Sequence, residues 1–282
     1  MILKGYAKVN IALDVAGRRV DGYHDVRMIM QTIPLYDEIS VGRAEGSGEI
    51  FLTCDDKELP VDERNLAFKA ASLVMRKFGI NASVSIDIKK NIPKEAGLAG
   101  GSADAAAVIN AMDSLFCLNM SEKQKDEIAV RLGADVPFCL RKGTYLSEGI
   151  GERLTKIADF PNCHMLLVKP AFGISTAWAY NEVDKKNNIN HPDIDGLISA
   201  IEKGSLKEIA GLKGNVLEAV SEDKYPEIRE IKRKLEDMGA VFSMMSGSGP
   251  TVFGIFDDKG KAEKASKEFS GYQHFLLEIT AI

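Results

Sequence analysis

The 282-residue sequence predicts a globular protein in which strands and helices are mixed, long enough for one large or two ordinary domains. Two observations support this prediction. Short runs of β-branched and other apolar residues, typical of strands, alternate with longer segments whose apolar residues recur at helical spacing. The composition, 45% hydrophobic and 27% charged, is that of a chain that buries a core.

The first half of the chain is expected to open with two strands, residues 4–15 and 27–41, separated by a turn-like segment at 17–22. A helix is expected over 65–78, because Asn65 can cap its start and Gly79 lies just past its end. Three further elements follow: a half-buried strand through Val84, Ile86 and Ile88, an alanine-rich helix over 105–116, and a second helix after it. Ser121 is expected to open this second helix with Gln124 as its capping-box partner, and Gly133 is expected to close it.

The second half is expected to start after a strand and turn at 143–154, with a domain boundary near 159–162 that divides the chain into 1–160 and 161–282. Residues 184–195 are polar and rich in asparagine, which predicts an exposed loop. The other expected elements are strands over 164–168, 241–245, 251–256 and 275–282, and helices over 176–183, 193–203, 215–219, 226–238 and 261–269.

Charge and cysteine usage exclude several classes of protein. The formal net charge of −5 argues against a nucleic-acid or anionic-membrane partner. The four cysteines are far apart and form no C-x-x-C pair, so neither a metal site nor a disulfide is expected, and Cys117 and Cys139 are expected to be buried free thiols. The first residues lack the layout of a signal peptide, and no run approaches the roughly 18 apolar residues of a membrane span. We therefore expect a soluble, cytoplasmic protein.

A glycine-rich loop that leads into the alanine-rich helix is the most informative segment. The start of a helix has backbone N–H groups without partners, and glycines let an anion approach them. Neither the P-loop pattern nor the G-x-G-x-x-G fingerprint matches, and tight helix packing remains the alternative to phosphate binding. The candidate phosphate-binding residues are Pro93, Lys94, Glu95, Ala96, Gly97, Leu98, Ala99, Gly100, Gly101, Ser102 and Ala103.

Four other segments carry polar residues or glycines that could serve a site. Strand alternation puts Lys8 and Asn10 on one face, which either lines a cleft or is the solvated face of an edge strand. Asp21-Gly22-Tyr23-His24 is either a plain turn or a ligand contact. Asp135 either caps a short helix or carries chemistry. The Ser-Gly-Ser-Gly-Pro segment at 246–250 is either a hairpin turn or a place where backbone approaches a ligand.

Taken together, these segments resemble the GHMP kinase superfamily in order and spacing, from Lys4 to about Phe256. The glycine loop and the Ser-Gly-Ser-Gly turn resemble the superfamily as a whole. The Asp-Gly-Tyr-His and Ala-Lys-x-Asn segments are similar to its members that phosphorylate the 2-hydroxyl group of 4-diphosphocytidyl-2-C-methyl-D-erythritol in non-mevalonate isoprenoid synthesis. The further segments that match are Gln31-Thr32, Leu35-Tyr36-Asp37, Gly133-Ala134-Asp135-Val136-Pro137 and Thr251.

Three departures from the family pattern lie in the loop. Ala96 and Ala99 stand where glycine is usual, and Ala103 replaces a frequent second serine. We expect the loop to keep its phosphate-binding conformation, because an alanine methyl group is tolerated where φ is negative.

The resemblance implies an α+β fold, the two-domain GHMP kinase fold, with the active site in the interdomain cleft. It implies ATP and Mg²⁺ as cofactors, with magnesium held mainly by phosphate oxygens and water rather than by protein ligands, and Ser102 near the phosphates. The implied partner is the small cytidylyl substrate, bound by a monomer or homodimer.

The resemblance also assigns roles to single residues. Asp135 is implied as the general base and Lys8 as its charge partner. The implied substrate-binding residues are Asn10, Tyr23, His24, Tyr180, Gly247 and Ser248. Two alternatives remain: another small-molecule kinase of the superfamily, such as a mevalonate or homoserine kinase, and a catalytically silent nucleotide-binding relative.

Overall fold

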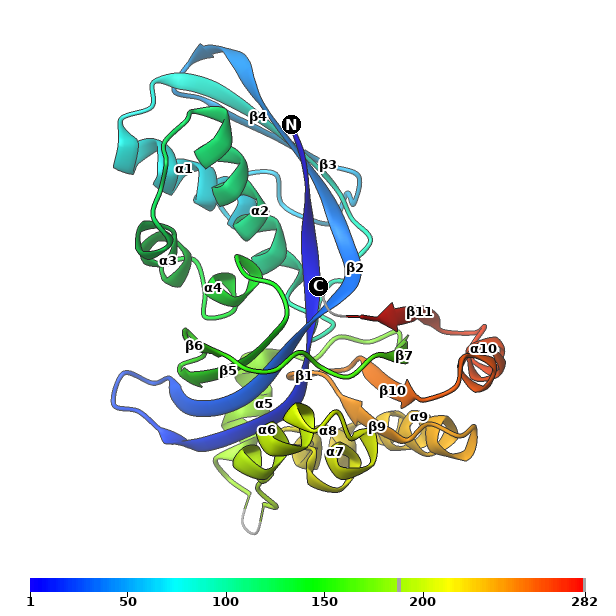
Figure 1. Ribbon diagram of the computed structural model, residues 1–282. Coiled ribbons are helices and arrows are strands. Elements are labelled where there is room, and N and C mark those ends of the chain that lie inside the picture. The colour runs from blue at the N-terminus through cyan, green and yellow to red at the C-terminus, as the bar shows by residue number, and fades with distance from the viewer. Residues whose placement is uncertain (187–188, 281–282) are drawn as a thin grey trace. The chain divides into compact units, whose positions relative to one another are not determined.

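The computed structural model describes residues 1–186 and 189–280 (Figure 1). Contacts divide the chain into two compact units with interleaved segments. The first unit comprises Met1–Ala7, Leu35–Pro93 and Ala99–Lys142, and the second comprises Lys8–Pro34, Lys94–Leu98 and the chain from Gly143 onwards. The expected domain boundary near residue 160 stays a prediction.

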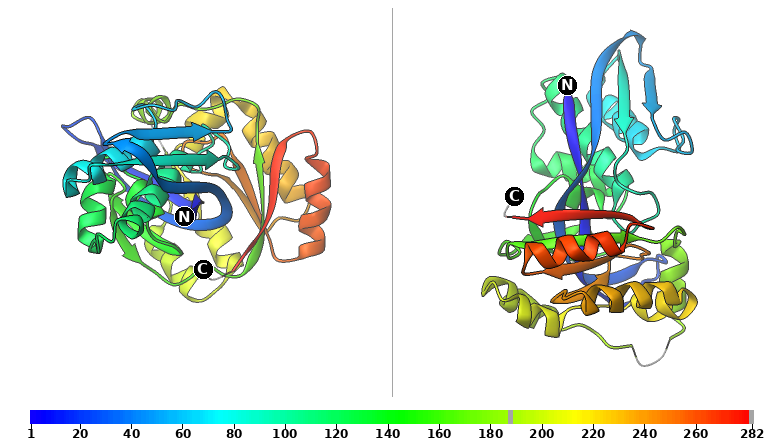
Figure 2. Two further views of the ribbon diagram at one scale, coloured as in Figure 1. Left: turned by 90° about the horizontal axis from the view of Figure 1, so that it is seen from above. Right: turned by 90° about the vertical axis from the view of Figure 1, so that its right-hand side faces the viewer.

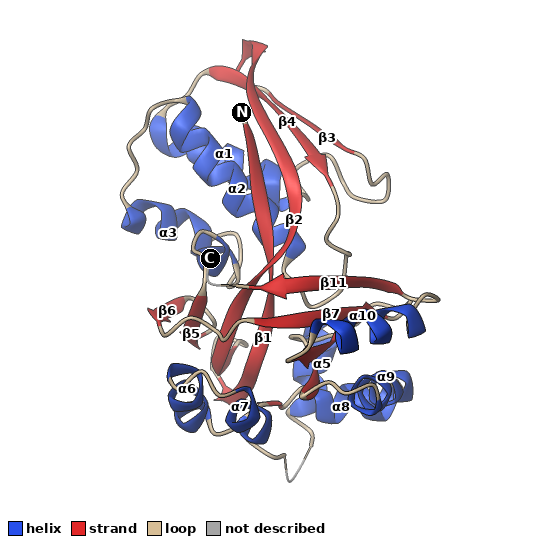
Figure 3. Ribbon diagram, turned by 45° about the vertical axis from the view of Figure 1, so that its right-hand side comes forward, coloured by secondary structure: helices blue, strands red, loops and turns tan. Residues whose placement is uncertain are grey.

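Two long strands, β1 (Ile2–Arg18) and β2 (His24–Ser47), contribute residues to both units (Figure 3). They extend the two strands predicted at 4–15 and 27–41 and confirm them. In the first unit β2 pairs antiparallel with β4 (Ala82–Lys89), and β3 (Ile50–Cys54) pairs parallel with β4. The strand β3 was not predicted.

Helices cover one face of the first unit's strands (Figure 1). They are α1 (Leu66–Phe78), α2 (Gly100–Leu115), α3 (Glu122–Val130) and the single turn α4 (Val136–Cys139). The core contains apolar residues of β2, β3 and β4 together with the alanines of α1 and α2, whose small side chains let these two helices pack closely.

Four predicted capping residues in this unit are confirmed, but the prediction that Gly133 closes α3 is wrong, because that helix ends at Val130 with Arg131 as its C-cap. The side chain of Asn65 accepts a hydrogen bond from the backbone of Ala67, and Gly79 ends α1 in the left-handed conformation. Ser121 and Gln124 form the expected capping box at the start of α3. The helix α2 starts five residues before the predicted Ala105, because the glycines themselves adopt helical backbone.

The second unit contains two groups of strands. Strand β5 (Thr144–Gly149) pairs antiparallel with β2 and with β6 (Arg153–Lys156), and the two-residue β8 (Gly214–Asn215) pairs parallel with β1. A separate four-stranded antiparallel sheet has the order β11 (Gln273–Ile279), β7 (Cys163–Lys169), β10 (Val252–Phe256) and β9 (Phe242–Met245). Residues 281 and 282 of the last predicted strand lie outside the described residues.

Two helices, α9 (Pro226–Asp237) and α10 (Lys259–Glu268), pack on one face of the four-stranded sheet (Figure 2). The other helices of this unit are α5 (Thr176–Val183), α6 (Ile194–Glu202), α7 (Leu206–Leu212) and α8 (Glu218–Lys224). The predicted helix over 215–219 is wrong: Asn215 lies in β8, and the helix starts at Glu218. The helix α7 was not predicted.

The expectation that Cys117 and Cys139 are buried is also wrong. Cys117 is exposed, because it follows the end of α2 in a turn with a positive φ of 53°, and Cys139 is half-buried. The buried thiols are Cys54 and Cys163, and all four cysteines are free. Burial raises the pKa of the Cys163 thiol to about 12. Within the described residues, no helix has the length and apolar content that a bilayer span requires.

Candidate active site

The glycine loop reverses its backbone direction several times before α2 begins. Glu95, Gly97 and Ala99 have positive φ angles of 50°, 73° and 60°, and the residues between them do not. Such alternation lets successive N–H groups point into one concavity, the arrangement that binds anions in many proteins. Gly100 then begins α2, so the loop leads directly into the positive end of a helix.

The backbone conformation of Ala99 contradicts one prediction. The expectation that alanine is tolerated there through a negative φ is wrong, because Ala99 takes the left-handed conformation (φ 60°, ψ 32°) at the N-cap position of α2. A non-glycine residue costs roughly 1–2 kcal/mol in this conformation. The loop therefore keeps the shape that glycine would give it, at a cost in stability.

The tip of the loop, Lys94–Leu98, belongs to the second unit and is fixed there by two hydrogen bonds. The carbonyl oxygen of Leu98 accepts from the backbone N–H of Lys8 at 3.1 Å. The carbonyl oxygen of Gly97 accepts from the hydroxyl group of Ser246 at 2.9 Å. These bonds hold the tip of the loop against β1, at Lys8, and against the turn at 246–250, so the three segments lie close together.

Lys8 and Asn10 contact one another directly. The Lys8 ammonium donates to the side-chain oxygen of Asn10 at 2.7 Å, and the Asn10 amide reaches the Met28 sulfur at 3.4 Å. Lys8 is only 4% exposed and Asn10 is 0% exposed, so the alternative that they form the solvated face of an edge strand is wrong. A Cβ atom on Gly247 would lie 3.3 Å from both Lys8 Nζ and Asn10 Oδ1, which places the turn at 246–250 against this pair.

Two residues that the sequence reasoning missed hold this turn in place. The Asn215 amide donates to the carbonyl oxygens of Met245 (2.9 Å) and Gly247 (2.8 Å). The Glu218 carboxylate accepts from the backbone N–H of Met245 at 2.6 Å. Burial raises the pKa of Glu218, although Lys232, whose ammonium lies 2.9 Å away, opposes that rise.

The predicted cytidine-binding residues lie in the second unit. His24 is buried, its Nε2 lies 2.8 Å from Asp184 Oδ1, and its ring centroid is 4.9 Å from that of Tyr180 at an angle of 34°. Tyr23 is exposed, and its role in stacking stays a prediction. Ser248 and Thr176 share a hydrogen bond of 3.0 Å between their hydroxyl groups. The structure thus brings His24 and Tyr180 together and adds Asp184, which was not predicted.

Asp135 lies in the first unit, at the N-cap position of the single turn α4. Its side chain makes no capping hydrogen bond to that turn, so the purely structural reading, in which the carboxylate caps α4, is wrong. Its partnership with Lys8 stays a prediction. Residues 1–186 and 189–280 contain no cluster of three or more His, Cys, Asp or Glu side chains able to hold a metal ion.

The sequence matches two protein-family models and is similar to curated proteins. Residues 65–143 match the model of the GHMP kinases N terminal domain, and residues 197–273 match that of the GHMP kinases C terminal domain. The 4-diphosphocytidyl-2-C-methyl-D-erythritol kinase of Clostridium botulinum (strain Loch Maree / Type A3) is 49% identical over 93% of each chain. Its namesake from Lachnoclostridium phytofermentans is 46% identical over 98% of this chain and 96% of its own.

The fold of this chain also superposes on solved structures. A crystal structure of 4-(cytidine 5'-diphospho)-2C-methyl-D-erythritol kinase superposes with a TM-score of 0.83, at 29% identity over 99% of this chain and 98% of the other. A homoserine kinase from Cytophaga hutchinsonii superposes with a TM-score of 0.76 at 20% identity, over 98% of this chain and 94% of its own, which is a likeness of fold alone.

Proposed function

The chain belongs to the family of 4-diphosphocytidyl-2-C-methyl-D-erythritol kinases, and from that membership we propose how its own residues carry out the transfer. The predicted mixed helix and strand fold of the GHMP kinases is confirmed. The chain is a phosphotransferase of the non-mevalonate isoprenoid pathway that uses ATP. The roles of single residues are our proposal.

In the proposed reaction, the 2-hydroxyl oxygen of the cytidylyl substrate forms a bond to the γ-phosphorus of ATP. The bond from that phosphorus to the β,γ-bridging oxygen breaks, ADP leaves, and the hydroxyl proton passes to Asp135. Phosphoryl transfer depends mainly on in-line positioning and on neutralising charge on the moving group. The residues of this chain therefore act chiefly by holding the two substrates.

The glycine loop, Pro93 to Ala103, is proposed to hold the ATP phosphates through its backbone N–H groups, which begin at Lys94 because Pro93 has none. The positive φ angles of Gly97 and Ala99 and the start of α2 at Gly100 support this role, because alternating backbone conformations next to a helix start are typical of anion-binding backbone. When bound, Mg²⁺ would neutralise phosphate charge in the transition state. It would be held mainly by phosphate oxygens and water, with the hydroxyl group of Ser102 nearby.

Lys8 is proposed to keep the Asp135 carboxylate ionised and to shield charge on the transferred group. The burial of its ammonium supports this role, because a buried cation costs stability unless charged or polar groups surround it. Lys8 has such a group in Asn10, which is proposed to contact the polar substrate near the transfer point.

The cytidine is proposed to stack on Tyr23 and Tyr180, with His24 reading its edge. The contact between His24 and Asp184 supports this role, because a carboxylate fixes the orientation and tautomer of an imidazole. Gly247 and Ser248 are proposed to contact the substrate from the turn at 246–250.

The observation that carries the proposal is the convergence of Lys8, Asn10 and Gly247 on the tip of the glycine loop. The test is transfer of labelled γ-phosphate from ATP to a panel of alcohols that includes the cytidylyl substrate, mevalonate and homoserine. We expect labelling of the cytidylyl substrate alone, and loss of transfer but not of ATP binding in Lys8→Met. Labelling of mevalonate or homoserine, or ATP binding without transfer to any acceptor, would contradict the proposal.

A further inference from the structure

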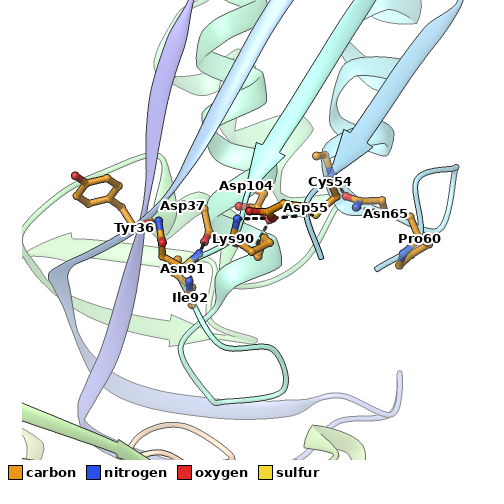
Figure 4. Close-up of polar contacts among 11 residues, drawn as sticks. Tyr36, Asp37, Cys54, Asp55, Pro60, Asn65, Lys90, Asn91, Ile92 and Asp104 are labelled. Carbon is orange, nitrogen blue, oxygen red and sulfur yellow. Dashed lines mark hydrogen bonds and ion pairs between the residues drawn. The ribbon is translucent and has the colours of Figure 1, made fainter. Parts of the chain in front are cut away.

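Where the glycine loop begins and ends, one lysine bridges two buried carboxylates (Figure 4). The ammonium of Lys90 donates to Asp104 Oδ2 at 2.7 Å and to Asp37 Oδ2. The side chains of Asp37 and Asp104 are 0% and 5% exposed and that of Lys90 is 10% exposed. We name Lys90, Asp37 and Asp104 the Lys90 clamp. All three residues belong to the first unit.

The clamp fixes the segment that enters the loop. Asp37 Oδ1 accepts hydrogen bonds from the backbone N–H groups of Asn91 (2.6 Å) and Ile92 (2.8 Å). The backbone N–H of Lys90 donates to Asp55 Oδ1 at 2.9 Å. Three successive residues before the loop are thus held by carboxylates, and bonds of this charge-assisted kind are among the stronger ones in proteins.

The clamp also fixes the segment that leaves the loop. Asp104 is the fifth residue of α2, just past the first turn, so its bond to Lys90 joins the beginning of that helix to the entering segment. The two segments touch: a Cβ atom on Gly100 would lie 3.1 Å from Ile92 Cγ2 and 3.5 Å from Lys90 Nζ. Lys90 therefore sets the separation between the two ends of the loop.

Stability alone does not account for this arrangement. Burying three charged groups carries a desolvation cost that their mutual attraction often fails to recover, and apolar residues of similar size are frequently as stable. Asp104 Oδ1 is buried and has no hydrogen-bond partner among residues 1–186 and 189–280, which adds to that cost. A costly buried cluster at both ends of a ligand-binding loop is better explained by what it does to the loop.

We propose that Lys90, Asp37 and Asp104 are positioning residues for ATP: the clamp holds the start of α2 at the distance from Asn91 and Ile92 at which the loop N–H groups converge on the phosphates. The proposal rests on the proposed role of the loop. A shift of the loop N–H groups by about 1 Å weakens binding and catalysis severely. By holding these groups in place, the clamp raises the affinity for ATP without contacting it.

The decisive variant is Asp104→Asn, which keeps the shape of the side chain and leaves the Lys90–Asp37 ion pair intact. We expect KM and Kd for MgATP to rise about tenfold, and KM for the cytidylyl substrate to change less than about threefold. We also expect faster hydrogen exchange at Gly100–Ala103 and, at pH 8, no loss of folding stability. A merely structural role would instead lower stability and leave the ATP affinity of the folded protein unchanged.

The matched control is Asp113→Asn. Asp113 lies on the same helix, pairs with Lys125 at 2.7 Å and accepts from the backbone of Met120, yet it is near the other end of α2. We expect this variant to lose stability while KM for ATP stays within about twofold. Equal effects of the two substitutions on KM for ATP would overturn the inference.

A second variant separates the inference from the proposed function. Gly101→Asp puts a carboxylate in the loop at a position where a Cβ atom meets only Leu66, at 3.6 Å. If Gly101→Asp leaves the Kd for MgATP unchanged, the loop does not hold the phosphates and the proposed function fails with the inference. If Gly101→Asp weakens ATP binding and Asp104→Asn does not, only the inference fails. Should Asp104→Asn not fold, the triple variant Lys90→Met, Asp37→Asn, Asp104→Asn removes all three charges of the clamp and carries the same expectation.

Discussion

The hydroxyl group of Ser246 donates a hydrogen bond of 2.9 Å to the carbonyl oxygen of Gly97, and a Cβ atom on Gly97 would overlap the backbone of Ser246. The two residues lie 149 positions apart in the sequence. Their contact joins the tip of the glycine loop to the turn at 246–250. Because there is no room for a side chain between them, the two segments fix each other's position.

Gly97→Ala is therefore expected to destabilise the protein. The methyl group would overlap Ser246, and the positive φ of 73° would add backbone strain. Overpacking and left-handed strain together cost about 2–4 kcal/mol of unfolding free energy, measurable by urea denaturation. Gly211→Ala is the control: it lies in α7 with no atom near its added Cβ, and we expect it to be neutral or stabilising by up to about 1 kcal/mol. Equal stability of the two variants would contradict the packing argument.

Ala99→Gly is expected to have the opposite effect. Glycine removes a left-handed strain of roughly 1–2 kcal/mol. It also gives the unfolded chain more freedom, which costs about 0.5–1 kcal/mol. The net expectation is a stabilisation of about 0.5–1 kcal/mol, with the loop unchanged in shape and the Kd for ATP unchanged. A loss of stability on the same denaturation assay would show that Ala99 is not strained.

His24→Ala is expected to act on one substrate only. His24 is buried against Tyr180 and pairs with Asp184, so its loss removes the group proposed to read the base edge. KM for the cytidylyl substrate should rise by about tenfold or more, while KM for ATP changes little. Asp184→Asn should give a smaller rise, because it keeps the imidazole and loses only its charged partner. Parallel increases in both KM values would count against the assignment.

The pH dependence of stability is expected to report Asp104. Burial raises its pKa from 3.8 to about 7, helped by Asp37 and opposed by Lys90. Cys54 and Asp55 are the other titratable groups beside the clamp. Burial tends to lower the pKa of Lys90, yet the two carboxylates outweigh it and raise that pKa, so the lysine stays charged throughout.

An aspartate with a raised pKa binds its proton more tightly in the folded state than in the unfolded state. Its stabilising contribution is therefore complete below about pH 4 and is lost as the pH rises through about 7. Between pH 5 and pH 8 this group should lower the unfolding free energy by on the order of 2 kcal/mol. Denaturation of Asp104→Asn over the same range should lack that decrease. Identical pH profiles for the two proteins would show that Asp104 is ionised throughout.

Local features of the fold were predictable from the sequence, because their causes are local. Asn65, Gly79, Ser121 and Gln124 cap helices through contacts within a few residues, and the structure confirms each of them. The placement of Lys8 and Asn10 on one face followed from strand alternation, and the structure adds the hydrogen bond between them.

What the sequence did not reveal depends on distant contacts. The predicted helix at 215–219 failed because the side chain of Asn215 bonds to backbone 30 and 32 residues away. The clamp was missed because Lys90 meets a carboxylate 53 residues before it. The sign of φ at Ala99 was missed because alanine disfavours the left-handed conformation, and only the packing around the loop imposes it.

The most direct test of the catalytic account is a single-turnover assay with MgATP and the cytidylyl substrate, comparing the unsubstituted enzyme with Asp135→Asn. We predict one ADP and one 2-phosphate product per turnover, a rate lower by about 10² to 10⁴ in the variant, and an unchanged Kd for ATP. Transfer by Asp135→Asn at the full rate would contradict the role of Asp135 as the general base.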